Sequence, residues 1–464
     1  MMTDGVNTRE LALNILLQIE KEGVPCHVAV RQMLEKFQFL PKQDRAFLTR
    51  LCDGTVEYQV QNDYVINQYS KTKIHKCKPV IRALLRMSVY QIRFMDGVPD
   101  AAVVNEAVKL ASKKGFFQLK GFVNGVLRSI VREKDHLTFP DRNSDLTKYL
   151  SVRYSMPEFL VEEFLEQYPE DVTEKMLASF LETHPTTIRI NRFRNTEEET
   201  LKSLEKQGVT VEKAPYVKEA WYIRGYDHLS RLTAFQQGRF QVQDVSSMLV
   251  TQAADPHPGD TVLDLCAAPG GKSLHMADRM LGCGFVQARD LTPYKVQLIR
   301  NNIERSGLTN VTAEEWDATV PDPDWVRKAD VVLADVPCSG YGVIGKKADI
   351  RYHASRNKEN ELICLQRKIL ENAASYVRNG GTLVFSTCTV NRKENEENFR
   401  WFLEEFPFEA VSLNDCLPEE LHSEETAQGF LQLIPGIHNC DGFFFAKFRK
   451  KGTESGSRLP DPAE

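Results

Sequence analysis

The stretch VLDLCAAPGGKS (residues 262–273) joins a short apolar run to a tight turn of small residues and then to a segment of helical character. Small residues let the backbone approach a ligand closely, and the first turn of a helix offers N–H donors without intrahelical partners. The stretch is not GxxxxGK[ST], because Cys266 stands where the first glycine would be, and it is not GxGxxG. It predicts a strand, a ligand-binding loop and a helix, although the glycines alone also fit an ordinary strand–helix turn.

Strands and helices alternate around this stretch from about residue 240 onward. The segments TVLDL, GFVQARD, VTAEEWD, ADVVLADVP and GTLVFSTC are typical of strands, and helical segments separate several of them. Short apolar strands separated by helices predict a doubly wound, mostly parallel sheet. DGFFFAKFRK is typical of a late strand at an antiparallel edge. Residues 238–450 are therefore expected to form an α/β, Rossmann-like domain, followed by a disordered tail over 451–464.

Two further domains are expected before residue 238. Residues 1–140 have the apolar spacing of amphipathic helices, as in TRELALNILLQIEKEG, where Thr8 is the expected N-cap and Gly23 the stop. This pattern predicts an all-α bundle. Residues 141–237 begin with helices and continue as strand (TTIRINRF), helix (EEETLKSLEKQG) and strand (VTVEKAPY), which predicts a small α+β module.

The composition is that of a soluble multidomain protein. At 464 residues the chain exceeds the size of one hydrophobic core, and it has neither an apolar run of transmembrane length nor a visible signal peptide. Ten scattered cysteines without a CxxC pair indicate reduced thiols in the cytoplasm, with no disulfide framework and no metal site.

The charge is distributed unevenly along the chain. Residues 1–140 hold 21 Lys and Arg against 14 Asp and Glu, so their net charge is +7, while the net charge of −5 for the whole chain leaves −12 for the rest. This pattern favours a polyanionic partner at the N-terminal end, although solvated basic helices would produce the same asymmetry.

Three acids stand where strands of the expected sheet end. Asp290 ends the second strand, Asp317 the third and Asp335 the fourth. Doubly wound sheets bind ligands in the crevice beyond the carboxyl ends of their strands, where an acid can accept from both hydroxyls of a ribose. One such acid is commonly a helix cap, but three in succession indicate a site. A nucleoside-containing cofactor without a pyrophosphate, such as S-adenosylmethionine, fits this arrangement.

Two cysteines follow neighbouring strands of this sheet. Cys338 lies just beyond the fourth strand, in ADVPCSGYGVIGKKADIRY, and Cys388 just beyond the fifth, in FSTCTV. Each fits plain packing, since free cysteine is commonly buried. Their shared position beside the cofactor loop favours chemistry instead. A thiolate that adds to C6 of a pyrimidine makes C5 nucleophilic enough to attack a sulfonium methyl group, provided that the base is unpaired or flipped out. Asp335 could then hydrogen-bond the base edge, and the residues alone leave open which cysteine attacks.

The motifs DLCAAPGGKS, ADVPCSGYGVI and FSTCTVNRKENEENF together resemble those of the RNA cytosine-C5 methyltransferases of the NOL1/NOP2/Sun family, and QVQDVSSMLV is similar to the segment that precedes their cofactor motif. RAFLTRLCDGTVEY, AAVVNEAVKLASKKG and KGFVNGVLR resemble the NusB antitermination-factor fold, an RNA-binding domain. Bacterial members of the family that modify small-subunit ribosomal RNA carry this pair of domains.

The resemblance implies the role of each candidate residue. The cofactor loop falls on Cys266, Ala267, Ala268, Pro269, Gly270, Gly271 and Lys272. Asp290 is implied as the ribose acid, Asp317 as the acid near the adenine, and Asp335 as the contact to the target base and the cofactor. The resemblance makes Cys388 the nucleophile and Cys338 the thiol that assists product release.

The resemblance also implies the substrate, a cytosine of 16S rRNA, numbered 967 in that RNA, in naked rRNA or an early assembly intermediate. We expect a cytoplasmic monomer without metal or membrane contact. The basic residues expected to grip RNA phosphates include Arg82, Arg86, Lys113, Lys114, Lys120 and Arg128. Two alternatives stay open: a non-catalytic RNA-binding factor with a vestigial methyltransferase fold, and a tRNA-specific enzyme.

Overall fold

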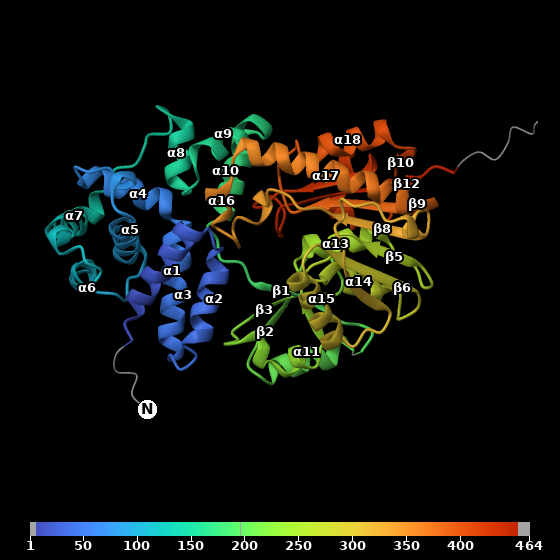
Figure 1. The fold of residues 1–464 in the computed structure, drawn as a ribbon, viewed down its shortest axis with the longest axis horizontal. Coiled ribbons are helices and arrows are strands. Elements are labelled where there is room, and N and C mark those ends of the chain that lie inside the picture. The colour runs from blue at the N-terminus through green and yellow to red at the C-terminus, as the bar shows by residue number, and fades with distance from the viewer. Residues whose placement is uncertain (1–5, 195, 453–464) are drawn as a thin grey trace, which may run out of the picture. The chain divides into compact units, whose positions relative to one another are not determined.

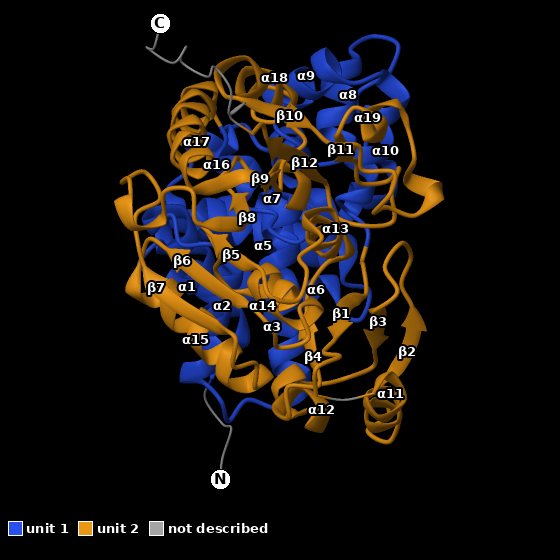
Figure 2. Cartoon of the chain, turned by 90° about the vertical axis from the view of Figure 1, so that its right-hand side faces the viewer, with its two compact units in different colours: residues 1–182, 344–354 blue, residues 183–343, 355–464 orange. Residues whose placement is uncertain are grey.

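The computed structural model describes residues 6–194 and 196–452, so most of the expected tail, 451–464, lies outside the described residues. The chain forms two compact units. Unit 1 comprises residues 1–182 and 344–354, and unit 2 comprises residues 183–343 and 355–464 (Figure 2). Among the described residues, no helix is long and apolar enough to cross a membrane.

The described residues of unit 1 form helices and no strand, and those up to residue 140 agree with the predicted all-α bundle (Figure 1). Its α-helices are α1 (Thr8–Glu22), α2 (Cys26–Lys36), α3 (Lys42–Glu57), α4 (Gln59–Tyr69), α5 (Pro79–Phe94), α6 (Asp100–Lys113), α7 (Lys120–Glu133), α8 (Leu146–Arg153), α9 (Glu158–Gln167), α10 (Glu170–Ser179) and α16 (Ile350–His353). The stop of α1 is the predicted Gly23, in a left-handed conformation with φ of 66°. The predicted N-cap Thr8 is wrong by one residue: the Asn7 side chain accepts from the N–H groups of Arg9 and Glu10.

Segment 344–354, which follows the Cys338 loop in sequence, belongs to unit 1. The fully buried guanidinium of Arg351 donates to the carbonyl of Ser155 at 2.8 Å, and the Tyr352 hydroxyl donates to the carbonyl of Val56 at 2.9 Å. The helical unit therefore incorporates a piece of chain more than 160 residues away along the sequence. The periodicity of the sequence does not predict that segment 344–354 joins the helical unit, because this placement depends on packing between distant segments.

Unit 2 contains two sheets. The smaller is antiparallel, in the order β2-β3-β1-β4, and the larger has eight strands in the order β10-β12-β9-β8-β5-β6-β7, with β11 paired to β12. The strands are β1 (Thr186–Ile190), β2 (Thr210–Lys213), β3 (Ala220–Arg224), β4 (Phe240–Val242), β5 (Thr261–Asp264), β6 (Phe285–Asp290), β7 (Val311–Glu315), β8 (Ala329–Asp335), β9 (Val377–Thr387), β10 (Phe408–Ala410), β11 (Phe430–Leu433) and β12 (Phe443–Lys450). The α-helices are α11 (Glu197–Glu205), α12 (Thr233–Gln236), α13 (Val245–Ala254), α14 (Gly271–Arg279), α15 (Pro293–Ser306), α17 (Arg356–Tyr376), α18 (Glu396–Glu405) and α19 (Glu424–Ala427).

The predicted doubly wound sheet is confirmed: β7, β6, β5, β8 and β9 are parallel neighbours. The late strand β12 is antiparallel to β9, as predicted. Its predicted place at the edge is wrong, because β10 and β11 pair with its other side.

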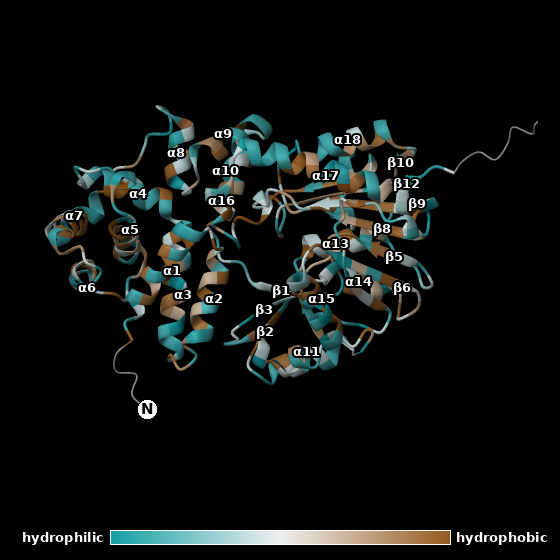
Figure 3. Cartoon of the chain, viewed as in Figure 1, coloured by the Kyte–Doolittle hydropathy of each residue, from teal (hydrophilic) through white to brown (hydrophobic). Residues whose placement is uncertain are grey.

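Alternate residues of the central strands pack into two different cores. Val262, Leu333 and Val384 join the core that contains residues of α13 and α14. Leu263 and Phe385 join the core that contains residues of α17 and α18. Side chains of a strand alternate between its two faces, so strands covered on both faces must be apolar throughout. Figure 3 accordingly colours β5, β8 and β9 as hydrophobic.

A buried ion pair joins the small sheet to the cofactor-loop helix. Arg189 on β1 donates to Oδ2 of Asp278 on α14 at 2.8 Å and to Oε1 of Gln243 at 2.9 Å. The same carboxylate accepts from the backbone N–H groups of Arg192 and Phe193, at 3.2 and 2.8 Å. Both charged side chains are 2% exposed. These bonds attach β1 and the residues that follow it to α14.

We expect Asp278→Ala to lower the free energy of unfolding of unit 2 by about 3–5 kcal/mol, because it leaves the buried Arg189 charge without its partner. Urea denaturation followed by tryptophan fluorescence measures this loss, since Trp221, Trp316, Trp325 and Trp401 all lie in unit 2. The control is Glu198→Ala, which removes the solvent-exposed Glu198–Lys202 pair of α11 and should leave the midpoint nearly unchanged. Equal effects of the two variants would contradict a structural role for the buried pair.

Candidate active site

The parallel pairing of β8 with β9 brings the two predicted cysteines together. Asp335, the last residue of β8, lies opposite Ser386 near the end of β9. Cys338 and Cys388 follow these two strand ends, and their Sγ atoms are 3.3 Å apart. Both cysteines are half-buried residues. Contact with Cys388 and burial raise the pKa of the Cys338 thiol well above its ordinary value.

Direct hydrogen bonds connect the loops that carry the thiols. The N–H of Gly342 donates to the carbonyl of Cys388 at 3.1 Å. The hydroxyls of Ser339 and Thr389, each adjacent to one of the cysteines, are 2.7 Å apart. The two loops therefore form one structural unit whose geometry fixes the distance between the sulfurs.

Asp335 links the thiol loops to the cofactor loop. Its Oδ1 accepts from the Ser386 hydroxyl at 2.8 Å, and its Oδ2 accepts from Lys272 Nζ at 2.7 Å. The ammonium of Lys272 also lies 4.8 Å from the centre of the Phe443 ring. Lys272 therefore places a cation beside the carboxylate at the end of β8.

The predicted cofactor loop, residues 266–272, crosses the carboxyl ends of the parallel strands. The N–H of Ala267 donates to the carbonyl of Arg289 at 2.8 Å, and the N–H of Ala268 donates to Oδ2 of Asp290 at 2.9 Å. Gly270 has φ of 102°, a conformation that favours glycine, and a side chain there would meet Ile299. The loop ends at the first turn of α14, whose N–H groups lack intrahelical acceptors.

Asp290 is almost fully buried at the end of β6. Its carboxylate accepts from the backbone N–H groups of Ala268 and Leu291 and pairs with Lys295 Nζ at 3.0 Å. A carboxylate offers about four acceptor positions, so one remains for a ligand hydroxyl beside the Lys295 contact. Asp290 thus fixes the loop at the end of β6.

Asp317 lies differently from the other predicted acids. It is exposed and two residues beyond the end of β7. Its Oδ1 accepts from the backbone N–H and the hydroxyl of Thr319, at 2.9 and 2.7 Å, which closes a local turn. The backbone N–H of the neighbouring Trp316 donates to the carbonyl of Asp290 at 3.0 Å, so this turn starts beside the end of β6. The role of Asp317 at a cofactor stays a prediction.

Sequence reasoning missed a fourth acid, Asp264, which ends β5 immediately before the cofactor loop. It is fully buried and accepts from the Ser273 hydroxyl at 2.5 Å. Burial raises its pKa to about 7. The sequence pattern that identifies Asp290 and Asp335, an acid at the end of a predicted strand, also applies to Asp264. Asp264 was missed because it lies within the motif VLDLC, before the glycine loop.

The donor set of this crevice fits S-adenosylmethionine better than a nucleotide with phosphates. Asp290 and Asp335 contribute two carboxylates, paired with Lys295 and Lys272, and the buried Asp264 is a third acid whose pKa is raised to about 7. A pyrophosphate would place further negative charge beside these acids, whereas a sulfonium and an ammonium group would place positive charge there.

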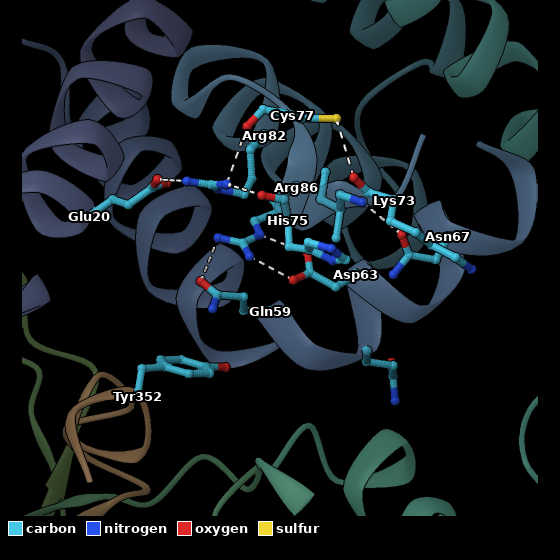
Figure 4. A network of polar contacts seen from close by, with 12 residues as sticks. Glu20, Gln59, Asp63, Asn67, Lys73, His75, Cys77, Arg82, Arg86 and Tyr352 are labelled. Carbon is cyan, nitrogen blue, oxygen red and sulfur yellow. Dashed lines mark hydrogen bonds and ion pairs between the residues drawn. The ribbon is translucent and has the colours of Figure 1, made fainter. Parts of the chain in front are cut away.

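The basic side chains of unit 1 that were expected to bind phosphates already have partners. Figure 4 shows Arg86 bound to both carboxylate oxygens of Asp63, at 2.7 and 2.6 Å, and Arg82 paired with Glu20. Lys113 and Lys114 both pair with Glu10. The ammonium of Lys120 lies over the Phe117 ring, and Arg128 donates to Asn124. Binding of RNA by these residues stays a prediction, and for Arg82 and Arg86 it would require exchange of a partner.

A parallel sheet with a glycine loop after its first strand and acids at the ends of β5, β6 and β8 defines the class of S-adenosylmethionine-dependent methyltransferases. Comparison with known proteins narrows this class. The model of 16S rRNA methyltransferase RsmB/F matches residues 251–449, that of the NusB family matches 6–132, and that of the RsmF/B-like ferredoxin-like domain matches 156–226.

Curated relatives match almost the whole chain. The probable ribosomal RNA small subunit methyltransferase B of Bacillus subtilis is 37% identical, over 96% of this chain and 99% of the relative. Its counterpart in Synechocystis is 33% identical, over 96% of this chain and 100% of the relative. Among solved structures, PH0851 superposes with a TM-score of 0.80 at 28% identity, over 96% of this chain and 99% of that chain. The chain belongs to the ribosomal RNA small subunit methyltransferase B family, whose members use S-adenosylmethionine.

Asp290→Ala should weaken the binding of S-adenosylmethionine by about 1–3 kcal/mol, the cost of losing charge-assisted hydrogen bonds to the ligand and to the loop. Isothermal titration calorimetry measures the affinity, with Glu304→Ala, an exposed change on α15, as the control. Unchanged affinity for the Asp290 variant would remove this residue from the cofactor site.

The raised pKa of Asp264 predicts a pH dependence of stability. Between the ordinary aspartate pKa and about 7 the unfolded chain ionises this group while the folded chain keeps it protonated, so folded stability falls as pH rises. Asp264→Asn removes this contribution, and its free energy of unfolding relative to wild type should increase from pH 5 to pH 7 by up to about 1 kcal/mol per pH unit. Urea denaturation at pH 5, 6 and 7 measures the difference, and a constant difference would contradict the buried neutral acid.

Proposed function

We propose that this protein transfers a methyl group from S-adenosylmethionine to C5 of a cytosine in 16S rRNA, with a transient covalent bond between Cys388 and C6 of the base. By family resemblance the target is cytosine 967. The 3.3 Å approach of the Cys338 and Cys388 sulfurs, beside Asp335 and the cofactor loop, carries the proposal. A single thiol would serve addition alone, whereas two thiols at one base can divide addition and release.

The cofactor supplies the methyl group, and residues of this chain and solvent water carry out the other parts of the reaction. Bound in the crevice, the cofactor offers a methyl group on a positively charged sulfur. The Cys388 thiolate adds to C6, and the displaced ring electrons make C5 a nucleophile that takes the methyl group. Asp335, held between Lys272 and Ser386, hydrogen-bonds the base edge and favours protonation of the ring nitrogen. Solvent water then takes the C5 proton, the electron pair of that C–H bond re-forms the C5–C6 double bond, and the Cys388 sulfur leaves C6 as a thiolate.

Cys338 assists the release step. Its raised thiol pKa keeps it protonated near neutral pH, so it can act as a proton donor or relay beside the departing Cys388 sulfur. Its position 3.3 Å from Cys388 allows proton exchange with that sulfur without any movement of the two loops. Asp335 and the two cysteines therefore have separate tasks within one small volume.

Incubation with labelled S-adenosylmethionine and unmodified small-subunit rRNA, followed by bisulfite mapping of the product, tests the activity and the target. We expect one 5-methylcytosine in 16S rRNA. Methyl transfer to tRNA instead would make the enzyme tRNA-specific. No methyl transfer to either RNA would favour a non-catalytic RNA-binding factor.

Substitution of each cysteine by alanine should stop the reaction at a different step. Cys388→Ala should abolish methyl transfer while binding of S-adenosylmethionine persists, because the cofactor loop is intact. Cys338→Ala should retain addition and lose release, so a covalent protein–RNA adduct should appear as a shifted band on a denaturing gel. An adduct with Cys388→Ala and none with Cys338→Ala would invert the two roles.

A further inference from the structure

A buried polar cluster lies beneath the two thiol loops, in the segment that follows Cys388. Glu394 and Asn395 are adjacent in sequence and have no exposed surface. A buried charge or amide is costly unless hydrogen bonds satisfy it, so such residues adopt geometries that their partners define. The chemistry proposed above assigns no step to these two side chains, whose hydrogen bonds go to residues that flank the thiols.

Glu394 contacts the Cys338 loop. Its Oε2 accepts from the backbone N–H of Ser339, the residue after Cys338, at 2.9 Å. The same oxygen accepts from Gln366 Nε2 at 2.8 Å, and this amide also donates to the carbonyl of Pro337, the residue before Cys338, at 3.0 Å. Asn391 donates to the other oxygen at 3.2 Å. Glu394 and Gln366 together therefore hold the backbone on both sides of Cys338.

Asn395 contacts the Cys388 loop instead. Its Oδ1 accepts from the hydroxyl of Thr387 at 2.6 Å, and its Nδ2 donates to the carbonyl of Thr389 at 3.0 Å. Nδ2 also donates to Oε1 of Gln432 on β11 at 2.7 Å. The amide thus spans Cys388, with one contact to each neighbouring residue and a third that anchors it to the sheet.

We propose that these two adjacent residues are separate positioning residues for the two thiols, Glu394 for Cys338 and release, Asn395 for Cys388 and addition. This inference rests on the proposed function, because it assigns each residue to one step of that reaction. Its physical basis is that both side chains are fully buried and each bonds to the backbone or side chains immediately flanking one cysteine. The Cys388 sulfur must lie against C6 and the Cys338 sulfur must lie beside it, so a loop that moves by about 1 Å loses roughly 100-fold in rate.

The carboxylate of Glu394 suits its contacts, because Ser339, Gln366 and Asn391 all donate to it. Glu394→Gln keeps the size and shape of the side chain, but it replaces one acceptor oxygen with an NH₂ group, which is a donor. Whichever way the amide is turned, this group faces another donor. That donor is Asn391 Nδ2 on one side, or the Ser339 N–H together with Gln366 Nε2 on the other. The variant therefore loosens the Cys338 loop without leaving a cavity. Asn395→Ala removes both contacts that span Cys388.

The two variants should give opposite results on the denaturing gel described above. Glu394→Gln should accumulate the covalent protein–RNA adduct, as Cys338→Ala does, with turnover reduced about 100-fold. Asn395→Ala should form adduct about 100-fold more slowly than wild type. Glu397→Ala, an exposed change in the first turn of α18, is the control and should leave both adduct and turnover unchanged.

A second measurement needs neither RNA nor cofactor. The pH profile of Cys338 alkylation by iodoacetamide, followed by mass spectrometry of the Cys338 peptide, should shift to lower pH in Glu394→Gln, because removal of a nearby negative charge favours the thiolate. Asn395→Ala should leave the charge at Cys338 unchanged. If the substitutions only impaired folding, both variants would bind S-adenosylmethionine more weakly, and their effects on addition and on release would be the same.

The outcomes distinguish this inference from the proposed function. If Cys338→Ala traps an adduct and Glu394→Gln does not, the assignment of Glu394 is overturned while the proposed function stands. Adduct formation at the wild-type rate in Asn395→Ala overturns the assignment of Asn395. If no variant and no wild-type protein forms an adduct or methylates RNA, the proposed function fails. Should Glu394→Gln not fold, Gln366→Met tests the same loop, because it removes the bonds to Glu394 and Pro337.

Discussion

The parallel pairing of β8 with β9 is the constraint on which the site depends. Its register sets Asp335 opposite Ser386, and the chains then leave the sheet at the same edge. Two loops that start from adjacent strand ends about 5 Å apart can bring their side chains together without long excursions. The Sγ–Sγ distance of 3.3 Å follows from this register and from the hydrogen bonds between the loops. A shift of one residue would turn one loop's side chains to the opposite face.

The same sheet edge gathers charges that would be unfavourable elsewhere. Asp264, Asp290 and Asp335 end three neighbouring parallel strands. Burial raises the pKa of Asp264, backbone N–H groups donate to Asp290, and Lys272 pairs with Asp335. Because the site combines these carboxylates with paired lysines, a positively charged cofactor is favoured. The buried Arg189–Asp278 pair joins β1 to α14, the helix at which the cofactor loop ends.

Polar residues outside the reacting groups complete the geometry. Glu394, Asn395 and Gln366 are buried amides and carboxylates whose partners are the backbone and hydroxyls around the thiols. In a low-dielectric interior such networks are rigid when every group is satisfied. These residues lie on the segment after β9 and on α17, and they bond to the residues that flank the two cysteines.

The sequence by itself determined the alternation of strands and helices, the glycine loop, two of the acids at strand ends and the positions of both cysteines, because each is a local pattern of periodicity or residue type. The tertiary structure decided which of these groups meet: the register of β8 and β9, the pairing of Lys272 with Asp335, and the interior place of β12. It also decided that segment 344–354 joins the helical unit and that Glu394 lies under Cys338. These features depend on contacts between residues far apart in the chain, and one sequence carries no local signal for such contacts.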